Sequence, residues 1–112
     1  MYAVEDINTL RDLIVEIVDP DKIILFGSYA HGTPTENSDL DFLVIKSGKD
    51  LTIEEEFDMA IAIHNKRKQR DVKSKYDILF QTENQLLSCT ENNGIIANAL
   101  KTGEIVYERK DK

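Results

Sequence analysis

The sequence predicts an α/β (α+β) fold, in which helices pack on a small mixed β-sheet of three to four strands. Stretches with apolar residues at helical spacing alternate with short runs rich in β-branched and aromatic residues. These strand-like runs lie at 22–26, 40–45 and 75–80, and 104–107 is a candidate edge strand. The 112 residues are enough for one hydrophobic core, so we expect one domain over 1–112.

The first expected helix spans 4–18 and carries one apolar stripe. The stripe consists of Ile7, Leu10, Leu13, Ile14, Ile17 and Val18. Pro20 ends this helix, because proline disfavours a helical conformation in the residue before it. The strand at 22–26 is apolar on both faces, which predicts a central position in the sheet.

A second helix is expected to begin after Thr52, because Thr52 and Glu55 have the spacing of a capping box. Its apolar stripe is expected to face the core and consists of Ile53, Phe57, Ala60, Ile61 and His64. His64, toward the end of the stripe, is expected to be packed or partly exposed rather than catalytic. The basic cluster at 66–70 complements the helix dipole and is expected to be solvated, the alternative being contact with an acidic partner or with phosphates. A last helix with apolar Ile95, Ile96, Ala99 and Leu100 is expected to stop at Gly103.

Composition excludes several classes of function. The net charge is −7, from 14 Lys and Arg against 21 Asp and Glu. An acidic protein repels a phosphate backbone, so no nucleic acid polymer is expected as a partner. The single cysteine, Cys89, cannot form an internal disulfide, and no apolar run reaches the length of a membrane span. Because the N-terminus also lacks a signal peptide pattern, we expect a cytoplasmic protein without membrane contact.

Two acids one residue apart open the second strand. Asp39 and Asp41 point the same way, about 6.5 Å apart, because side chains alternate along a strand. An acid inside the apolar run 40–45 is disfavoured unless it is paired or binds a metal. Magnesium prefers oxygen ligands and is often held by one or two carboxylates together with substrate phosphates. The spacing therefore predicts a site for magnesium and a triphosphate.

The turn before these acids suits a phosphate. Gly27 gives the backbone the freedom to bring main-chain amides close to phosphate oxygens, and Ser28 can donate its hydroxyl. A short helix expected at 29–32 would direct its free N–H groups at the same anion. Ser38 is expected to close the loop with a hydrogen bond. Each of these features alone is ordinary turn composition, but together with the two acids they favour a functional site.

An acid also interrupts the third strand, at 75–80. Tyr76, Ile78 and Phe80 share one face of that strand, which leaves Asp77 on the other. Asp77 can therefore reach the first pair of acids if this strand lies beside theirs. The alternative is a polar residue at the edge of the sheet.

In this combination the residues resemble the signature of the DNA polymerase beta-type nucleotidyltransferase superfamily, in which Gly-Ser is followed by Asp-x-Asp. The match is carried by Gly27-Ser28, Gly32 and Ser38-Asp39-Leu40-Asp41. Nearly the whole chain is similar to a minimal nucleotidyltransferase (MNT) domain, a small prokaryotic protein often paired with a HEPN-domain partner. Many such domains have Arg before the second Gly. Here that residue is His31, a shorter and mostly neutral phosphate donor.

The resemblance implies a polymerase beta-type core and magnesium-dependent transfer of AMP from ATP. It implies that Asp39, Asp41 and Asp77 are the catalytic residues and hold one or two magnesium ions. Nucleotide binding is assigned to Gly27, Ser28, His31, Gly32 and Ser38. The implied acceptor is a hydroxyl, most simply a tyrosine, of a HEPN-domain toxin. The chain would then be the antitoxin of a type VII-like toxin–antitoxin pair.

Two other functions fit the same residues. A non-catalytic antitoxin or regulatory subunit would mask its partner by binding, and its acids could be replaced without loss of neutralisation. A small-molecule nucleotidyltransferase of the aminoglycoside-modifying kind would transfer a nucleotide with no protein partner present. Apolar residues of the last helix or the tail are candidates for contact with a protein partner.

Overall fold

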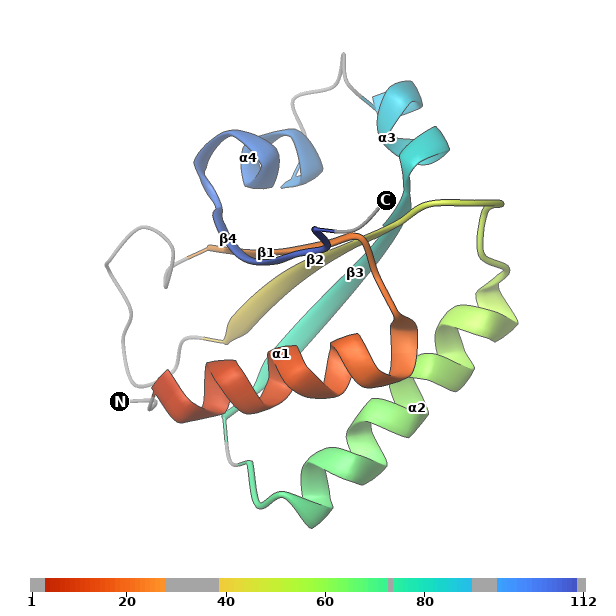
Figure 1. Ribbon diagram of the computed structural model, residues 1–112. Helices are drawn as coiled ribbons and strands as arrows, with labels where there is room; N and C mark the ends of the chain where they lie inside the picture. The colour runs from red at the N-terminus through yellow and green to blue at the C-terminus, as the bar shows by residue number, and fades with distance from the viewer. Residues whose placement is uncertain (1–3, 28–38, 73, 90–94, 111–112) are drawn as a thin grey trace.

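The computed structural model describes residues 4–27, 39–72, 74–89 and 95–110. This part of the chain forms a four-stranded sheet covered by helices on both faces (Figure 1). Helices α1 (Val4–Val18) and α2 (Ile53–Gln69) lie on one face. Helices α3 (Glu83–Cys89) and α4 (Ile95–Thr102) lie on the other. The predicted class, a small mixed sheet with packed helices, is confirmed.

The strands are β1 (Lys22–Phe26), β2 (Leu40–Lys46), β3 (Tyr76–Thr82) and β4 (Glu104–Glu108), in the order β3-β2-β1-β4. Strand β1 runs antiparallel to β2 and β4, whereas β2 and β3 are parallel. The central position predicted for β1 and the edge position predicted for β4 are confirmed. The parallel pairing brings the N-terminal ends of β2 and β3 to the same end of the sheet.

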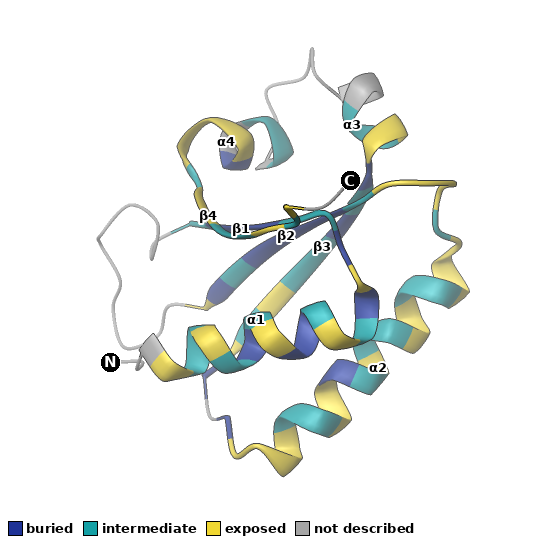
Figure 2. Ribbon diagram, in the orientation of Figure 1, coloured by how far each residue is buried: buried dark blue, intermediate teal, exposed yellow. Residues whose placement is uncertain are grey.

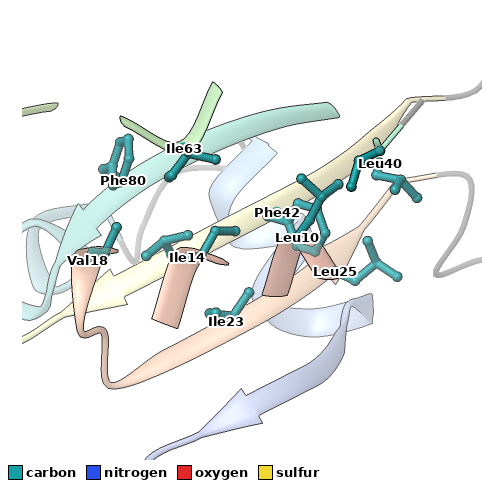
Figure 3. Packing of buried hydrophobic residues seen from close by; sticks show 11 residues of the cluster. Leu10, Ile14, Val18, Ile23, Leu25, Leu40, Phe42, Ile63 and Phe80 are labelled. Atoms are coloured by element: carbon teal, nitrogen blue, oxygen red, sulfur yellow. The ribbon is translucent and has the colours of Figure 1, made fainter. Parts of the chain in front are cut away.

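The larger core lies between the sheet and the helices α1 and α2 (Figure 3). Alternation along β2 turns Leu40, Phe42 and Val44 into this core, where all three are fully buried. The other fully buried or nearly buried members are Leu10, Ile14, Val18, Ile23, Leu25, Ile63, Val72 and Phe80. The opposite face of β2 carries Leu43 and Ile45, which pack with Ile24 and with Ala99 of α4.

The capping box that opens α2 is confirmed. The side chain of Thr52 accepts a hydrogen bond from the Glu55 N–H at 3.1 Å. The Glu55 carboxylate accepts one from the Thr52 N–H at 2.9 Å.

The core-facing stripe predicted for α2 is wrong. Ile63 is the buried residue of this helix, whereas Ile53, Phe57 and Ile61 are 86%, 62% and 43% exposed. Figure 2 shows α2 coloured as exposed or intermediate along most of its length. His64 is also exposed. The physical reason is that α2 contacts the core through Ile63, with Met59 packed beside it. At about 100° per residue this pair lies about a third of a turn around the helix from Ile53 and Phe57.

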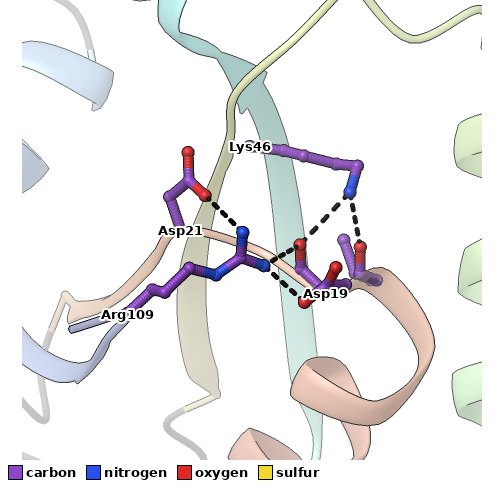
Figure 4. Close-up of polar contacts among 5 residues, drawn as sticks. Asp19, Asp21, Lys46 and Arg109 are labelled. Carbon is purple, nitrogen blue, oxygen red and sulfur yellow. Dashed lines mark hydrogen bonds and ion pairs between the residues drawn. The ribbon is translucent and has the colours of Figure 1, made fainter. Parts of the chain in front are cut away.

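The start of β1 is held by a polar cluster at the end of the sheet opposite Gly27 (Figure 4). Arg109 forms ion pairs with Asp19 and with Asp21, the latter at 3.3 Å. Lys46 donates hydrogen bonds to the carbonyl oxygens of Val18 and Asp19 at 2.9 and 3.2 Å. The cluster ties the segment after β4 to the junction of α1 and β1. None of the helices described here is long and apolar enough to cross a membrane.

Candidate functional site

Three acids meet at the end of the sheet where β1 stops and β2 and β3 start. Asp41 is in register with Phe26 of β1 on one side and with Asp77 of β3 on the other. Neighbouring strands are about 4.8 Å apart, so Asp41 and Asp77 are direct cross-strand neighbours. Asp39 lies just before β2 and, by alternation, faces the same way as Asp41. The strand adjacency that the sequence could not establish for Asp77 is therefore present.

The negative charges of these acids act on one another. Partial burial raises the pKa of Asp41, and the neighbouring charges of Asp77 and then Asp39 raise it further. Asp39 and Asp77 are exposed, and one Asp77 oxygen accepts a hydrogen bond from the Ile78 N–H at 3.1 Å. The cluster thus concentrates negative charge where a cation would be stabilised.

Gly27 lies against this cluster. Its φ is +83°, in the region that side chains disfavour. A Cβ at this position would lie 2.5 Å from Oδ2 of Asp41, a separation that real Cβ atoms essentially never show. The turn after β1 and the carboxylate of β2 therefore fit together only because residue 27 has no side chain.

The chemistry of the donor set fits magnesium. Carboxylate oxygens are the hard ligands that this ion prefers, and Asp39, Asp41 and Asp77 supply them from two adjacent strands. In the part of the chain that the structure describes, no three His, Cys, Asp or Glu side chains are already arranged around a metal position. The backbone brings the acids together, and their side chains would have to turn toward a common ion.

The remaining predicted nucleotide-binding residues lie outside the described residues. These are Ser28, His31, Gly32 and Ser38. Of the predicted phosphate-binding turn, the structure describes Gly27.

A hollow of about 500 Å³ opens between α2 and β3, on the face of the sheet that carries Tyr76 and Ile78 and opposite the face to which Asp41 points. It is lined by Asp39, Ala60, His64, Arg67, Lys75, Tyr76, Asp77 and Ile78. The guanidinium of Arg67 lies 5.5 Å from the centre of the Tyr76 ring, close enough for a cation–π contact. Burial raises the pKa of Tyr76, and the charge of Arg67 partly opposes this.

Sequence reasoning missed the part played by α2 in this hollow. Arg67 belongs to the cluster expected to be solvated, and its neighbour Lys66 does form a partly exposed ion pair with Glu16 at 2.6 Å. Arg67 instead turns toward β3, and its Nε is buried without a hydrogen-bond partner among the described residues. The available signal was the spacing of Ala60, His64 and Arg67, which places them on one helix face.

Comparison with known proteins identifies the class. The family model described as "Polymerase beta, Nucleotidyltransferase" matches residues 8–112. The chain therefore belongs to this nucleotidyltransferase family, and the resemblance drawn from its motifs is confirmed. No curated protein matches the sequence significantly.

Solved structures share the fold. A toxin–antitoxin crystallised with AMP-PNP matches with a TM-score of 0.60 and 20% identity, over 92% of this chain and 73% of that one. A mutant of the toxin–antitoxin MntA-HpeT matches at 0.59 and 18%, again over 92% and 73%. A putative nucleotidyltransferase from Sulfolobus solfataricus matches at 0.54 and 19%, over 96% of this chain and 88% of that one. At these identities the likeness concerns the fold.

Proposed function

We propose that the chain is a magnesium-dependent nucleotidyltransferase that transfers AMP from ATP to a hydroxyl of a partner protein. The observation that supports this most is the register of Asp41 with Asp77, next to the side-chain-free turn at Gly27. In a member of this family, acids that can hold a cation then lie beside a turn whose backbone has the freedom to approach a phosphate. Like the relatives crystallised as toxin–antitoxins, the chain would act as an antitoxin.

Each residue of the site has a role in this proposal. Asp39 and Asp41 would hold magnesium, with Asp77 available for a second ion. Bound magnesium would neutralise phosphate charge and polarise the α-phosphate. The backbone at Gly27 and Ser28 would bind the β- and γ-phosphates, with His31, Gly32 and Ser38 completing the nucleotide site.

The transfer itself is a substitution at phosphorus. The acceptor oxygen forms a bond to the α-phosphorus while the bond to the β-phosphate oxygen breaks, and pyrophosphate leaves. Asp77 accepts the proton of the acceptor hydroxyl and returns it to solvent. Because Asp77 is exposed on the edge strand β3, an acceptor can approach it from outside the sheet.

The partner proposed is a HEPN-domain toxin, modified on a tyrosine and silenced by the modification. This part of the proposal rests on the similarity to MNT domains and on the two toxin–antitoxin structures that share the fold. The net charge of −7 supports a protein acceptor rather than a nucleic acid one.

The test is transfer from α-labelled ATP, with magnesium, to the protein encoded beside this chain. We expect label on that protein with the natural chain and none with Asp41→Asn. Asp12→Asn is the matched control, because Asp12 is an exposed acid on α1 that pairs with Arg11 at the surface, and it should transfer normally.

Two results would contradict the proposal. A stable complex that carries no label would indicate an antitoxin that works by masking. Transfer to an aminoglycoside with no protein present would indicate a small-molecule enzyme.

A further inference from the structure

Three of the large apolar side chains that the structure leaves exposed lie on one face of α2. Ile53, Phe57 and Ile61 follow at spacings of four residues, and they are 86%, 62% and 43% exposed. We call these three residues the α2 stripe. Single exposed apolar residues are ordinary, but a row of large ones on one helix face marks an interaction surface.

The α2 stripe continues into the hollow between α2 and β3. At about 100° per residue, Ile53, Phe57, Ala60, His64 and Arg67 fall within about 80° of one another around the helix. The last three of them line the hollow, together with Asp39 and Asp77. One helix face therefore runs from an exposed apolar row to the hollow beside the edge strand β3, which Asp77 also lines.

The length of this face argues for a macromolecule. From Ile53 to Arg67 the helix rises about 21 Å, at about 1.5 Å per residue. A small acceptor would fill the hollow of about 500 Å³ and leave the apolar row in water. A protein segment can cover the row and place one side chain in the hollow.

The charge beside the stripe indicates which side chains a docking protein segment would carry. Glu54 and Asp58 are exposed and border the stripe on the side of Ile61. A complementary surface therefore carries apolar side chains flanked by Lys or Arg. The net charge of −7 favours the same kind of partner.

We propose that the α2 stripe is the docking surface for the acceptor, which is a protein segment with apolar side chains and a basic flank. This inference rests on the proposed function and makes it specific: the stripe holds the partner protein beside the edge strand β3, and one of its hydroxyls reaches around this edge to Asp77, whose side chain lies on the face of the sheet away from α2. Phe57 is the central anchor, because aromatic residues near the middle of an interface contribute most to binding.

The experiment measures binding of the protein encoded beside this chain by titration calorimetry. An Ile53→Ser, Phe57→Ser double variant should weaken the Kd at least about 30-fold. Ile105→Ser is the matched control, because Ile105 is 51% exposed on β4, at the opposite edge of the sheet from β3. It should change the Kd less than about 3-fold.

Two further measurements show what the double variant has lost. Its melting temperature and its Kd for magnesium-ATP should match those of the natural chain, since the substituted side chains are exposed and outside the nucleotide site. A Glu54→Lys, Asp58→Lys variant should bind about tenfold more weakly, mainly through slower association.

Several outcomes would overturn the docking surface. The proposal fails if the natural chain does not bind the protein encoded beside it. It also fails if the double variant binds with the same Kd as the natural chain, or if Ile105→Ser weakens binding as much as the double variant does. Self-association of the natural chain that the double variant abolishes, seen by sedimentation, would assign the stripe to a second copy instead. The proposed function fails separately: binding that depends on the stripe without any label transfer would contradict the transferase and leave the docking surface standing.

Discussion

Replacing Gly27 by alanine tests the contact between the turn after β1 and the acid of β2. The added Cβ would lie 2.5 Å from Oδ2 of Asp41, and the backbone at this position has a φ of +83°. Two separate penalties follow. The residue must hold a left-handed conformation with a side chain, and the Asp41 carboxylate must move.

The size of both effects follows from this geometry. A left-handed conformation costs a residue with a side chain about 1–2 kcal/mol. One kcal/mol shifts the melting temperature of a small domain by roughly 4–8 °C, so the backbone penalty alone should lower it by roughly 4–16 °C. Displacing a proposed catalytic group by about 1 Å can lower a rate about 100-fold, so transfer should fall by at least that factor.

A second background separates the two penalties. In an Asp41→Ala chain the overlapping oxygen is absent, so Gly27→Ala should cost only the backbone part, about 1–2 kcal/mol. Thermal melts of the four chains, with label transfer for those that retain Asp41, complete the measurement. A Gly27→Ala chain that melts and transfers like the natural chain would refute this steric contact. A loss of stability from Gly27→Ala that is the same in the natural and the Asp41→Ala chains would refute it as well.

Three further predictions concern stability. Ile63→Ala should lower the free energy of unfolding by about 2–4 kcal/mol in urea titrations, whereas Ile53→Ala should change it by less than about 0.5 kcal/mol, and equal effects would contradict the packing of α2. Because the pKa of Asp41 is raised in the folded state, protonation of Asp41 stabilises the fold below about pH 4, the ordinary pKa of Asp. This stabilisation is lost as the pH rises through the pKa that Asp41 has in the folded state. Metal-free Asp41→Asn should therefore melt above the natural chain at pH 7, by more than at pH 4, and a constant difference would contradict a raised pKa caused by burial and by the neighbouring acids. Arg109→Ala should lower the melting temperature, because it removes the ion pair of the 11%-exposed Asp21 side chain, and an unchanged melt would show that this contact of the segment after β4 does not stabilise the fold.

Local patterns predicted most of the fold. The helix at 4–18 and the strand at 22–26 have the bounds that apolar periodicity and the Asp19-Pro20-Asp21 break indicated. The capping box of α2 formed because both partners are local. These elements depend on interactions between residues a few positions apart, and such interactions can be predicted from the sequence alone.

The features that local patterns could not establish depend on contacts between residues far apart in the sequence. The apolar residues of α2 suggested a stripe that faces the core, but Ile63 packs in the core and Phe57 is exposed to solvent. The adjacency of Asp77 and Asp41 depends on parallel pairing of β2 with β3, which no local pattern encodes. The stacking of Arg67 on Tyr76 likewise joins two segments only once the strands are ordered.

The central claim is that acids on two neighbouring strands act as one transferring site. The measurement is the rate of AMP transfer by Asp41→Asn, Asp77→Asn and the double variant, by mass spectrometry of the protein encoded beside this chain. Groups that act as a unit are strongly non-additive, so each single variant should be nearly as impaired as the double one. Transfer by Asp77→Asn at the rate of the natural chain would contradict the claim. So would a loss of rate in the double variant that equals the product of the two single losses.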